Sequence, residues 1–170
     1  MAANHGSPFL VNAASDPIVV RVCGRASFQN SQYVRDYIQQ AVREGHRRFV
    51  FDFADCTGMD STFLGVLAGA ALDLRKAVPT GTLVLCRLGQ RNLELVRNLG
   101  LHRLAAVVTG EDLAELKREG GTALQGPKLS ENEAARLVLE AHDALVEIDE
   151  ANRAKFQDVI SLLRGRVDHS

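Results

Sequence analysis

The sequence predicts an α/β layer fold, in which helices cross over between strands and pack on a β-sheet. The main reason is that short β-branched runs alternate with helical patterns of roughly ten to fifteen residues. The chain has 170 residues, of which 46% are hydrophobic and 24% charged, as in soluble globular domains. That length suits one domain, or one domain with an appendage. A stretch containing glycine and proline at 118–130 separates the alternating part from a helical C-terminal part.

The alternating part predicts its own elements from local patterns. Strands are expected where β-branched and aromatic residues cluster, at 18–22, 49–53, 82–88 and 104–108. Helices are expected at 31–44, 62–76, 90–98 and 109–118. Gly45 and Gly100 end the first and third helices, and Thr109 with Asp112 resembles a cap for the fourth. The helix at 62–76 is apolar nearly all round, so we expect it to be buried.

The C-terminal part begins with a capping box, Ser130 and Glu133, flanked by a hydrophobic staple of Leu129 and Ala134. From there to Gly165 the chain has neither Gly nor Pro, which predicts one long helix or two shorter ones bent near 150–153. Apolar residues follow a 3.5-residue seam that Asn152 and Lys155 interrupt: Val138, Ala141, Leu145, Ile148, Val159 and Leu162. This stripe must be buried, either against a second copy in a homodimer or against the chain's own domain.

These patterns divide the chain into an N-terminal segment at 1–16, a domain at 17–118, a linker at 119–129, a helical extension at 130–165 and a tail at 166–170. The formal net charge of −1 conceals two unlike parts. Residues 1–129 carry 15 basic and 12 acidic side chains, whereas residues 130–170 carry 5 basic and 9 acidic ones. The basic domain and the acidic extension are therefore expected to attract each other.

Composition also excludes several classes of partner. The near-neutral charge gives no general attraction to nucleic acid or to anionic lipid. The apolar runs are too short to cross a bilayer, and the N-terminus lacks the charged and apolar regions of a secretory signal. Cys23, Cys56 and Cys86 are widely spaced and have no CxxC pattern, so we expect reduced core cysteines and no metal site. The protein is expected to be cytoplasmic.

The sequence contains no familiar enzyme motif. GxGxxG, GxxxxGK[ST] and GxSxG are all absent. The histidines, none of which is assigned a role, form neither HxxxH nor HxH; they are His5, His46, His102, His142 and His169. Asp52, Asp55 and Asp60 cluster after a strand, which leaves a small enzyme or ligand sensor as an alternative. A supporting base, metal pair or phosphate loop is missing, so we expect no enzyme activity and no cofactor.

One segment combines a core strand, an acidic loop, a hydroxyl pair and a buried helix: DFADCTGMDSTFLGVL, residues 52–67. Ser61 stands where an N-cap is expected, because its hydroxyl can accept hydrogen bonds from the backbone amides of the first turn. Local physics alone assigns this serine a structural role as a cap.

The same segment resembles the signature of the STAS domain, named for sulphate transporters and anti-sigma factor antagonists. In that family an Asp-Ser-Ser/Thr-Gly-Leu-Gly-Val-Leu stretch follows the central strand, and the resemblance covers 17–118 in element order. It implies a mixed β-sheet with helices packed on it, to which the C-terminal helical extension would be added. Phe63 replaces the usual Gly, and Ser27 stands where an acidic residue is common.

The resemblance implies a function in partner switching. In antagonists of the family, an anti-sigma factor that is also a serine protein kinase phosphorylates the Ser after the Asp, which matches Ser61 here, with Thr62 as the alternative. The unphosphorylated domain would bind that kinase through Asp60, Ser61, Thr62, Phe63 and Leu64, and a phosphatase would reverse the modification. The other hypothesis is a scaffold without phosphorylation, which assembles through a Phe63 surface and the C-terminal helix.

Overall fold

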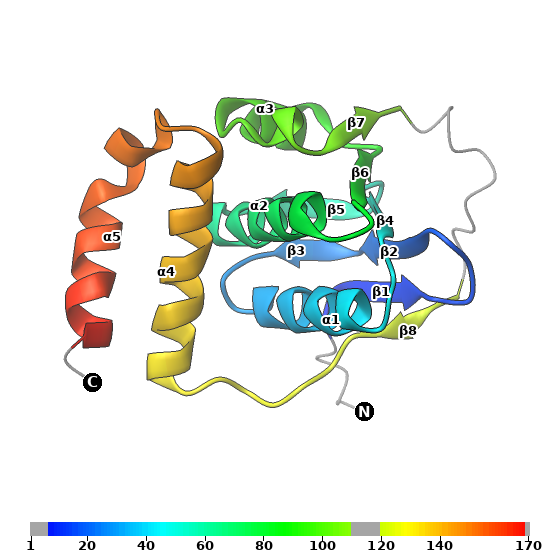
Figure 1. Ribbon diagram of the computed structural model, residues 1–170, viewed down its shortest axis with the longest axis horizontal. Coiled ribbons are helices and arrows are strands. Elements are labelled where there is room, and N and C mark those ends of the chain that lie inside the picture. Colours follow the sequence, from blue (N-terminus) through cyan, green and yellow to red (C-terminus); the bar gives the residue numbers. More distant parts are fainter. Residues whose placement is uncertain (1–6, 110–119, 169–170) are drawn as a thin grey trace.

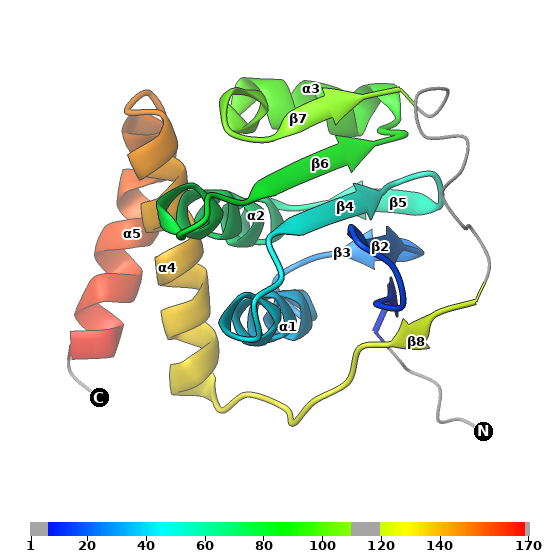
Figure 2. The same ribbon diagram turned by 45° about the vertical axis from the view of Figure 1, so that its right-hand side comes forward.

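A computed structural model describes residues 7–109 and 120–168, which form a mixed sheet, a smaller pair of strands and five helices. The sheet has the order β7-β6-β4-β2-β1-β8. Its parallel part comprises β2 (Ile18–Val22), β4 (Arg48–Asp52), β6 (Thr82–Cys86) and β7 (Ala106–Val108). Figure 2 shows the arrows of β4, β6 and β7 running in the same direction. The predicted α/β fold is thus confirmed.

Two further strands extend this sheet through antiparallel pairs beyond β2. β1 (Phe9–Asn12) pairs with β2, and β8 (Thr122–Ala123) pairs with β1 at the sheet edge. β1 comes from the segment assigned to the N-terminus, and β8 comes from the segment assigned to the linker. The sheet therefore draws on chain from both sides of the domain expected at 17–118.

Three helices of the domain pack with the sheet around the main core. They are α1 (Ser31–Arg43), α2 (Ser61–Lys76) and α3 (Gln90–Asn98). α2 is the central one, because it contacts α1, β6 and the C-terminal helix α4. Its buried side chains occur on every side of the helix, as its continuous apolar sequence predicts. The opposite face of the sheet carries a smaller cluster around Val19, Val50 and Cys86.

A second, two-stranded parallel sheet brings two loops to the start of α2. It consists of β3 (Gly24–Ala26) and β5 (Cys56–Met59). The chain leaves β3 towards α1 and leaves β5 directly into α2. Consequently the β3–α1 loop and the first turn of α2 are neighbours, although more than thirty residues separate them.

The C-terminal part is a pair of helices docked on the chain's own domain. α4 (Glu131–Ile148) starts at the predicted capping box, and α5 (Asn152–Asp168) follows a short turn. In Figures 1 and 2, α4 lies between α2 and α5. The bend predicted near 150–153 is confirmed, whereas a single continuous helix over 130–165 is wrong. The residues predicted as a helix at 109–118 lie almost entirely outside the described part.

Asn152, which interrupts the predicted seam, ties the helix pair to the domain. Its side chain is fully buried and its Nδ2 donates to the carbonyl oxygens of Leu99 (2.9 Å) and Leu145 (2.7 Å). These carbonyls belong to the end of α3 and to α4. Lys155 donates to the Asn98 carbonyl oxygen as well. The polar break in the seam therefore provides hydrogen bonds that fix the turn between α4 and α5.

Opposite charges also meet between the domain and the extension. Arg35 pairs with Glu140 at 3.5 Å, Lys76 with Glu147 at 3.7 Å, and Arg103 with Asp149 at 3.6 Å. The expected attraction between the basic domain and the acidic extension is therefore visible as ion pairs. Each has at least one well-exposed partner, so each contributes little, on the order of 0–1 kcal/mol. Within the described residues, no helix is long and apolar enough to cross a membrane.

Replacing Asn152 with Ala should lower the free energy of unfolding by about 1–3 kcal/mol, because the carbonyl oxygens of Leu99 and Leu145 lose the hydrogen bonds that its side chain donates. Urea unfolding followed by circular dichroism measures this loss. Gln157→Ala on the exposed side of α5 is the matched control and should have an effect within about 0.5 kcal/mol. Equal effects of the two substitutions would contradict the role assigned to Asn152.

Candidate functional site

The first turn of α2 is built around the carboxylate of Asp60. Its Oδ1 accepts a hydrogen bond from the Phe63 amide at 2.9 Å, and its Oδ2 accepts one from the Phe28 amide at 2.8 Å. Asp60 is thus the N-cap, and the prediction that Ser61 occupies that position is wrong by one residue. Both residue types cap helices well, so the local sequence does not distinguish them. The cap also joins the β3–α1 loop to α2.

Ser61 is the first residue of α2, and its hydroxyl meets a histidine of the C-terminal extension. The Ser61 Oγ lies 2.9 Å from His142 Nε2, and His142 Nδ1 lies 2.7 Å from the Val138 carbonyl oxygen. A carbonyl only accepts, so Nδ1 carries the hydrogen of the neutral ring and Nε2 is left as an acceptor. Ser61 therefore donates to His142. Because Asp60 performs the capping, the serine hydroxyl is available for this contact.

His142 lies between two helices and is only 3% exposed. Its ring meets the edge of Phe156 in α5, with centroids 4.9 Å apart and planes at 71°. The sequence indicated no catalytic or ligand role for any histidine, and it did not predict the contact of His142 with Ser61. The available signal was its place beside Ala141 and four residues after Val138, within a helix that must bury one side.

Thr62, Phe63 and Leu64 lie in the interior, with Phe63 and Leu64 0% exposed. The Phe63 ring stacks on Phe9 at a centroid distance of 5.6 Å and meets Phe53 edge-on at 6.3 Å. The prediction that Phe63 forms a contact surface is therefore wrong. Its side chain fills the space beside β1, a strand that the sequence did not predict. The hydroxyl of Thr62 is likewise poorly placed for modification.

The exposed aromatic residue at this site is Phe28. Its side chain is 54% exposed, while its backbone amide is bound by Asp60. The preceding Ser27 is buried, and its carbonyl accepts from the Ser31 hydroxyl at 2.6 Å. Phe28 is thereby held on a fixed loop next to the start of α2. Sequence reasoning missed it, because only the paired loops place residue 28 beside residue 60.

The aspartates that suggested an enzyme or sensor have separate partners. Asp52 is 2% exposed and forms an ion pair with Arg87 at 3.0 Å. Asp60 is occupied with backbone amides, and the Asp55 side chain is exposed. Within residues 7–109 and 120–168, no group of three or more His, Cys, Asp or Glu side chains is arranged to hold a metal. Burial raises the pKa of the Cys56 thiol, which disfavours the reactive thiolate.

The arrangement thus presents one hydroxyl at a helix N-terminus, with a carboxylate cap and an exposed phenylalanine beside it, on a mixed sheet. A family model of the STAS domain matches residues 9–115, and the chain belongs to the STAS domain family. The match includes β1, which lies before the start expected at residue 17. A comparison with curated proteins found no match.

Solved structures of anti-sigma factor antagonists share this fold. The chain is 19% identical to the antagonist SpoIIAA in its unphosphorylated form, with a TM-score of 0.51, covering 63% of this chain and 94% of that one. The chain is also 19% identical to the Bacillus cell fate determinant SpoIIAA in its phosphorylated form, with a TM-score of 0.52, covering 63% of this chain and 96% of that one. An anti-sigma factor antagonist from Mycobacterium paratuberculosis is 21% identical, with a TM-score of 0.54, and the match covers 65% of this chain and 93% of that one. At these identities the similarity shows the fold.

Truncation of the two phenylalanines beside the site, Phe28 and Phe63, should change the free energy of unfolding to very different extents. Phe63→Ala should lower the free energy of unfolding by about 3–5 kcal/mol, because it leaves a cavity between Phe9 and Phe53. Phe28→Ala should change it by no more than about 0.5 kcal/mol, since that ring is largely solvated. Guanidinium unfolding of both variants measures the difference. A large loss for Phe28→Ala would show that its ring is part of the core.

Proposed function

We propose that this STAS protein is a partner-switching regulator of the anti-sigma factor antagonist type, and that Ser61 is its phosphorylation site. The observation that carries the proposal is the Ser61 hydroxyl on the first residue of α2, next to a carboxylate that already caps the helix. The partner would be an anti-sigma factor with serine kinase activity, and a phosphatase would restore the hydroxyl. In this proposal the protein acts in the cytoplasm as a binding module and has no catalytic activity of its own.

Phosphorylation at this position suits the local electrostatics. Ser61 Oγ would bond to the γ-phosphorus of ATP while the bond to ADP breaks, and the hydroxyl proton would pass to a base of the kinase. The new group adds a charge of about −1.5 to −2 at neutral pH. The backbone amides and dipole at the start of α2 favour a negative charge there, whereas nearby Asp60 already makes the patch acidic. The charge would therefore be tolerated by the domain and repelled by an acidic partner surface.

The partner surface follows from what is accessible around Ser61. Asp60 and Ser61 are half-buried and Phe28 is exposed, so these residues are the ones that a partner would touch. Phe63 and Leu64 would act only by holding the first turn of α2 in place. Aromatic residues are enriched at protein interfaces, so the exposed ring of Phe28 is suited to contact a partner.

The alternative is a scaffold that assembles without phosphorylation. The observation in its favour is the outer side of α5, where Leu162 is 74% exposed and Val159 is also exposed. A second copy packing on this side would form a homodimer through the C-terminal extension. Light scattering of the intact chain separates the two functions, because a regulator that presents Ser61 needs no such assembly.

Incubation with ATP and a purified anti-sigma factor kinase from the same genome should add about 80 Da, mapped by mass spectrometry to Ser61. Ser61→Ala should abolish the modification, because it removes the hydroxyl. Thr62→Ala should leave it intact, because the Thr62 side chain is buried. A phosphate mapped elsewhere would overturn the assignment.

Phe28→Ala should weaken binding of the same kinase by roughly tenfold or more, since an aromatic interface residue contributes on the order of 1–2 kcal/mol or more. Isothermal titration calorimetry measures the affinity. Val78→Ala is a suitable control, because Val78 is a similarly exposed apolar residue at the far end of α2. Equal affinities of the two variants would place the partner surface elsewhere.

A further inference from the structure

We propose that α4 is an intramolecular cover for Ser61, and that docking of α4 and a phosphoryl group on Ser61 exclude each other. The chain itself is then the first occupant of the surface at the start of α2. That Ser61 is phosphorylated rests on the function proposed above, whereas the exclusion rests on the contacts that α4 and α5 make around Ser61. The extension would thus be both a restraint on modification and the element that modification releases.

The exclusion begins at the Ser61 hydroxyl. Its hydrogen is donated to His142 Nε2 across 2.9 Å. A phosphorylated Oγ has no hydrogen to donate, and it carries a phosphorus with three further oxygens. The imidazole occupies the space directly beside Oγ, and Phe156 closes the side facing α5. The phosphoryl group would therefore cost the protein this hydrogen bond and crowd the buried ring.

While α4 stays docked, close backbone packing against α2 limits how far it can shift near Ser61. A Cβ atom at Gly65 would overlap the Ala141 carbonyl group and stand only 2.7 Å from the Ala141 Cβ. The backbones of α2 and α4 are thus already in contact, one turn along α2 from Ser61. His142 directly follows Ala141 in α4. The backbone of His142 therefore cannot move away from Ser61 unless α2 and α4 separate at Gly65 and Ala141.

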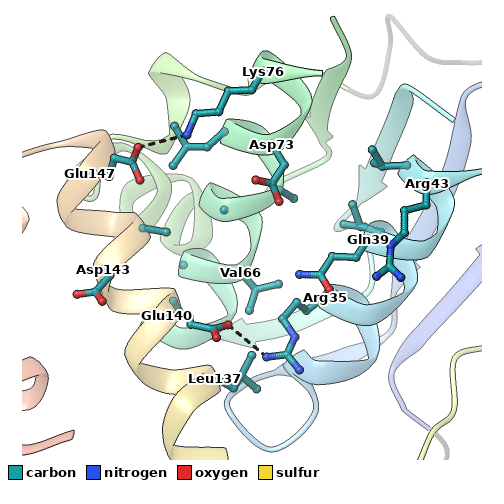
Figure 3. A pocket seen from close by; sticks show the side chains of 18 residues that line it. Arg35, Gln39, Arg43, Val66, Asp73, Lys76, Leu137, Glu140, Asp143 and Glu147 are labelled. Carbon is teal, nitrogen blue, oxygen red and sulfur yellow. Dashed lines mark hydrogen bonds and ion pairs between the residues drawn. The ribbon is translucent and has the colours of Figure 1, made fainter. Parts of the chain in front are cut away.

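The remaining contacts of α4 are compatible with release. Leu137, Ala141 and Leu145 are buried in the main core and supply most of the attraction. Towards α1, however, α4 borders an open hollow of about 580 Å³, across which Arg35 pairs with the exposed Glu140 (Figure 3). The same figure shows the pair Lys76–Glu147 at the other end of the hollow. α4 is therefore held mainly by α2 along its length and by the Asn152 hydrogen bonds at its C-terminal end.

The connection to the domain permits release without unfolding the sheet. After β8, residues 125–128 are exposed and outside any helix or strand, and the capping box at Ser130 keeps α4 helical from its own start. By thermodynamic linkage, a docked α4 disfavours modification of Ser61, and modification disfavours docking by the same factor. Release would expose the apolar side of α4 and the side of α2 that contains Gly65.

A negatively charged substitute for the phosphate tests the exclusion without any kinase. Ser61→Glu should raise amide hydrogen exchange of residues 131–148 by roughly tenfold or more, measured by mass spectrometry on the full chain. Ser61→Ala, which adds no bulk, should raise it much less, and Ala154→Glu on the exposed side of α5 should leave it unchanged. Unaltered protection of β4 and β6 verifies that the domain remains folded. Unchanged exchange of α4 in Ser61→Glu would overturn the proposal.

Two glycines of α2 provide a matched pair that leaves Ser61 intact. Gly65→Ala should release α4, because its Cβ would meet the Ala141 backbone, whereas Gly69→Ala should not, because its nearest neighbour would be the Ala144 Cβ at 3.9 Å. Both substitutions favour the helix itself by about 1 kcal/mol. Exchange of residues 131–148 should therefore rise only in Gly65→Ala. Equal exchange in the two variants would contradict the cover.

The same pair separates failure of the cover from failure of the proposed function. With the kinase and ATP, Gly65→Ala should be phosphorylated faster than Gly69→Ala, because α4 leaves its Ser61 uncovered for a larger share of the time. If neither variant is modified while Ser61→Glu and Gly65→Ala still release α4, the proposed function fails and the cover stands. If both are modified at the same rate although α4 is released only in Gly65→Ala, the cover does not restrain modification and the proposal is overturned.

Discussion

The close approach of α2 and α4 at Gly65 is the constraint on which the site depends. A side chain at Gly65 would overlap the Ala141 backbone, so only glycine lets the two helices meet at this distance. That approach buries Ala141 and Leu145, and it brings His142 within hydrogen-bond distance of Ser61. A slightly larger separation would leave the imidazole without its partner. The helix-helix contact and the polar contact are therefore consequences of one missing side chain.

Asp60 plays a comparable part on the domain side. Its two carboxylate oxygens bind amides from different segments, one in α2 and one in the β3–α1 loop. A serine at this position would offer one side-chain oxygen, whereas Asp60 directs a separate oxygen to each segment. With Asp60 as the cap, the Phe28 amide is fixed at the start of α2 and the Ser61 hydroxyl is left for its contact with His142. The cap thus determines both what is exposed at the site and which atom is available for chemistry.

Much of the fold was predictable from the sequence because its central elements have strong local patterns. The runs that form β2 and β4 are β-branched or aromatic, and Gly45 and Gly100 end helices with positive φ angles of 103° and 83°. β3 and β5 were missed, because such short strands owe their existence to pairing with each other. The position of Ser61 at the start of a helix was predictable from the motif. Its contact with His142 was not, because it joins positions 81 residues apart.

The tautomer of His142 makes the contact sensitive to the state of Ser61. The Val138 carbonyl holds the ring hydrogen on Nδ1, so a neutral His142 offers only a lone pair at Nε2. That lone pair is satisfied while Ser61 Oγ carries a hydrogen and loses its partner once the oxygen becomes an ester. In the buried setting beside Phe156, a ring nitrogen that finds no other partner costs on the order of 1–3 kcal/mol. Such a cost, added to the crowding, is comparable to the coupling free energies that typically link two binding events. A single hydrogen atom on Ser61 therefore connects the chemistry at the start of α2 with the packing of the C-terminal helices.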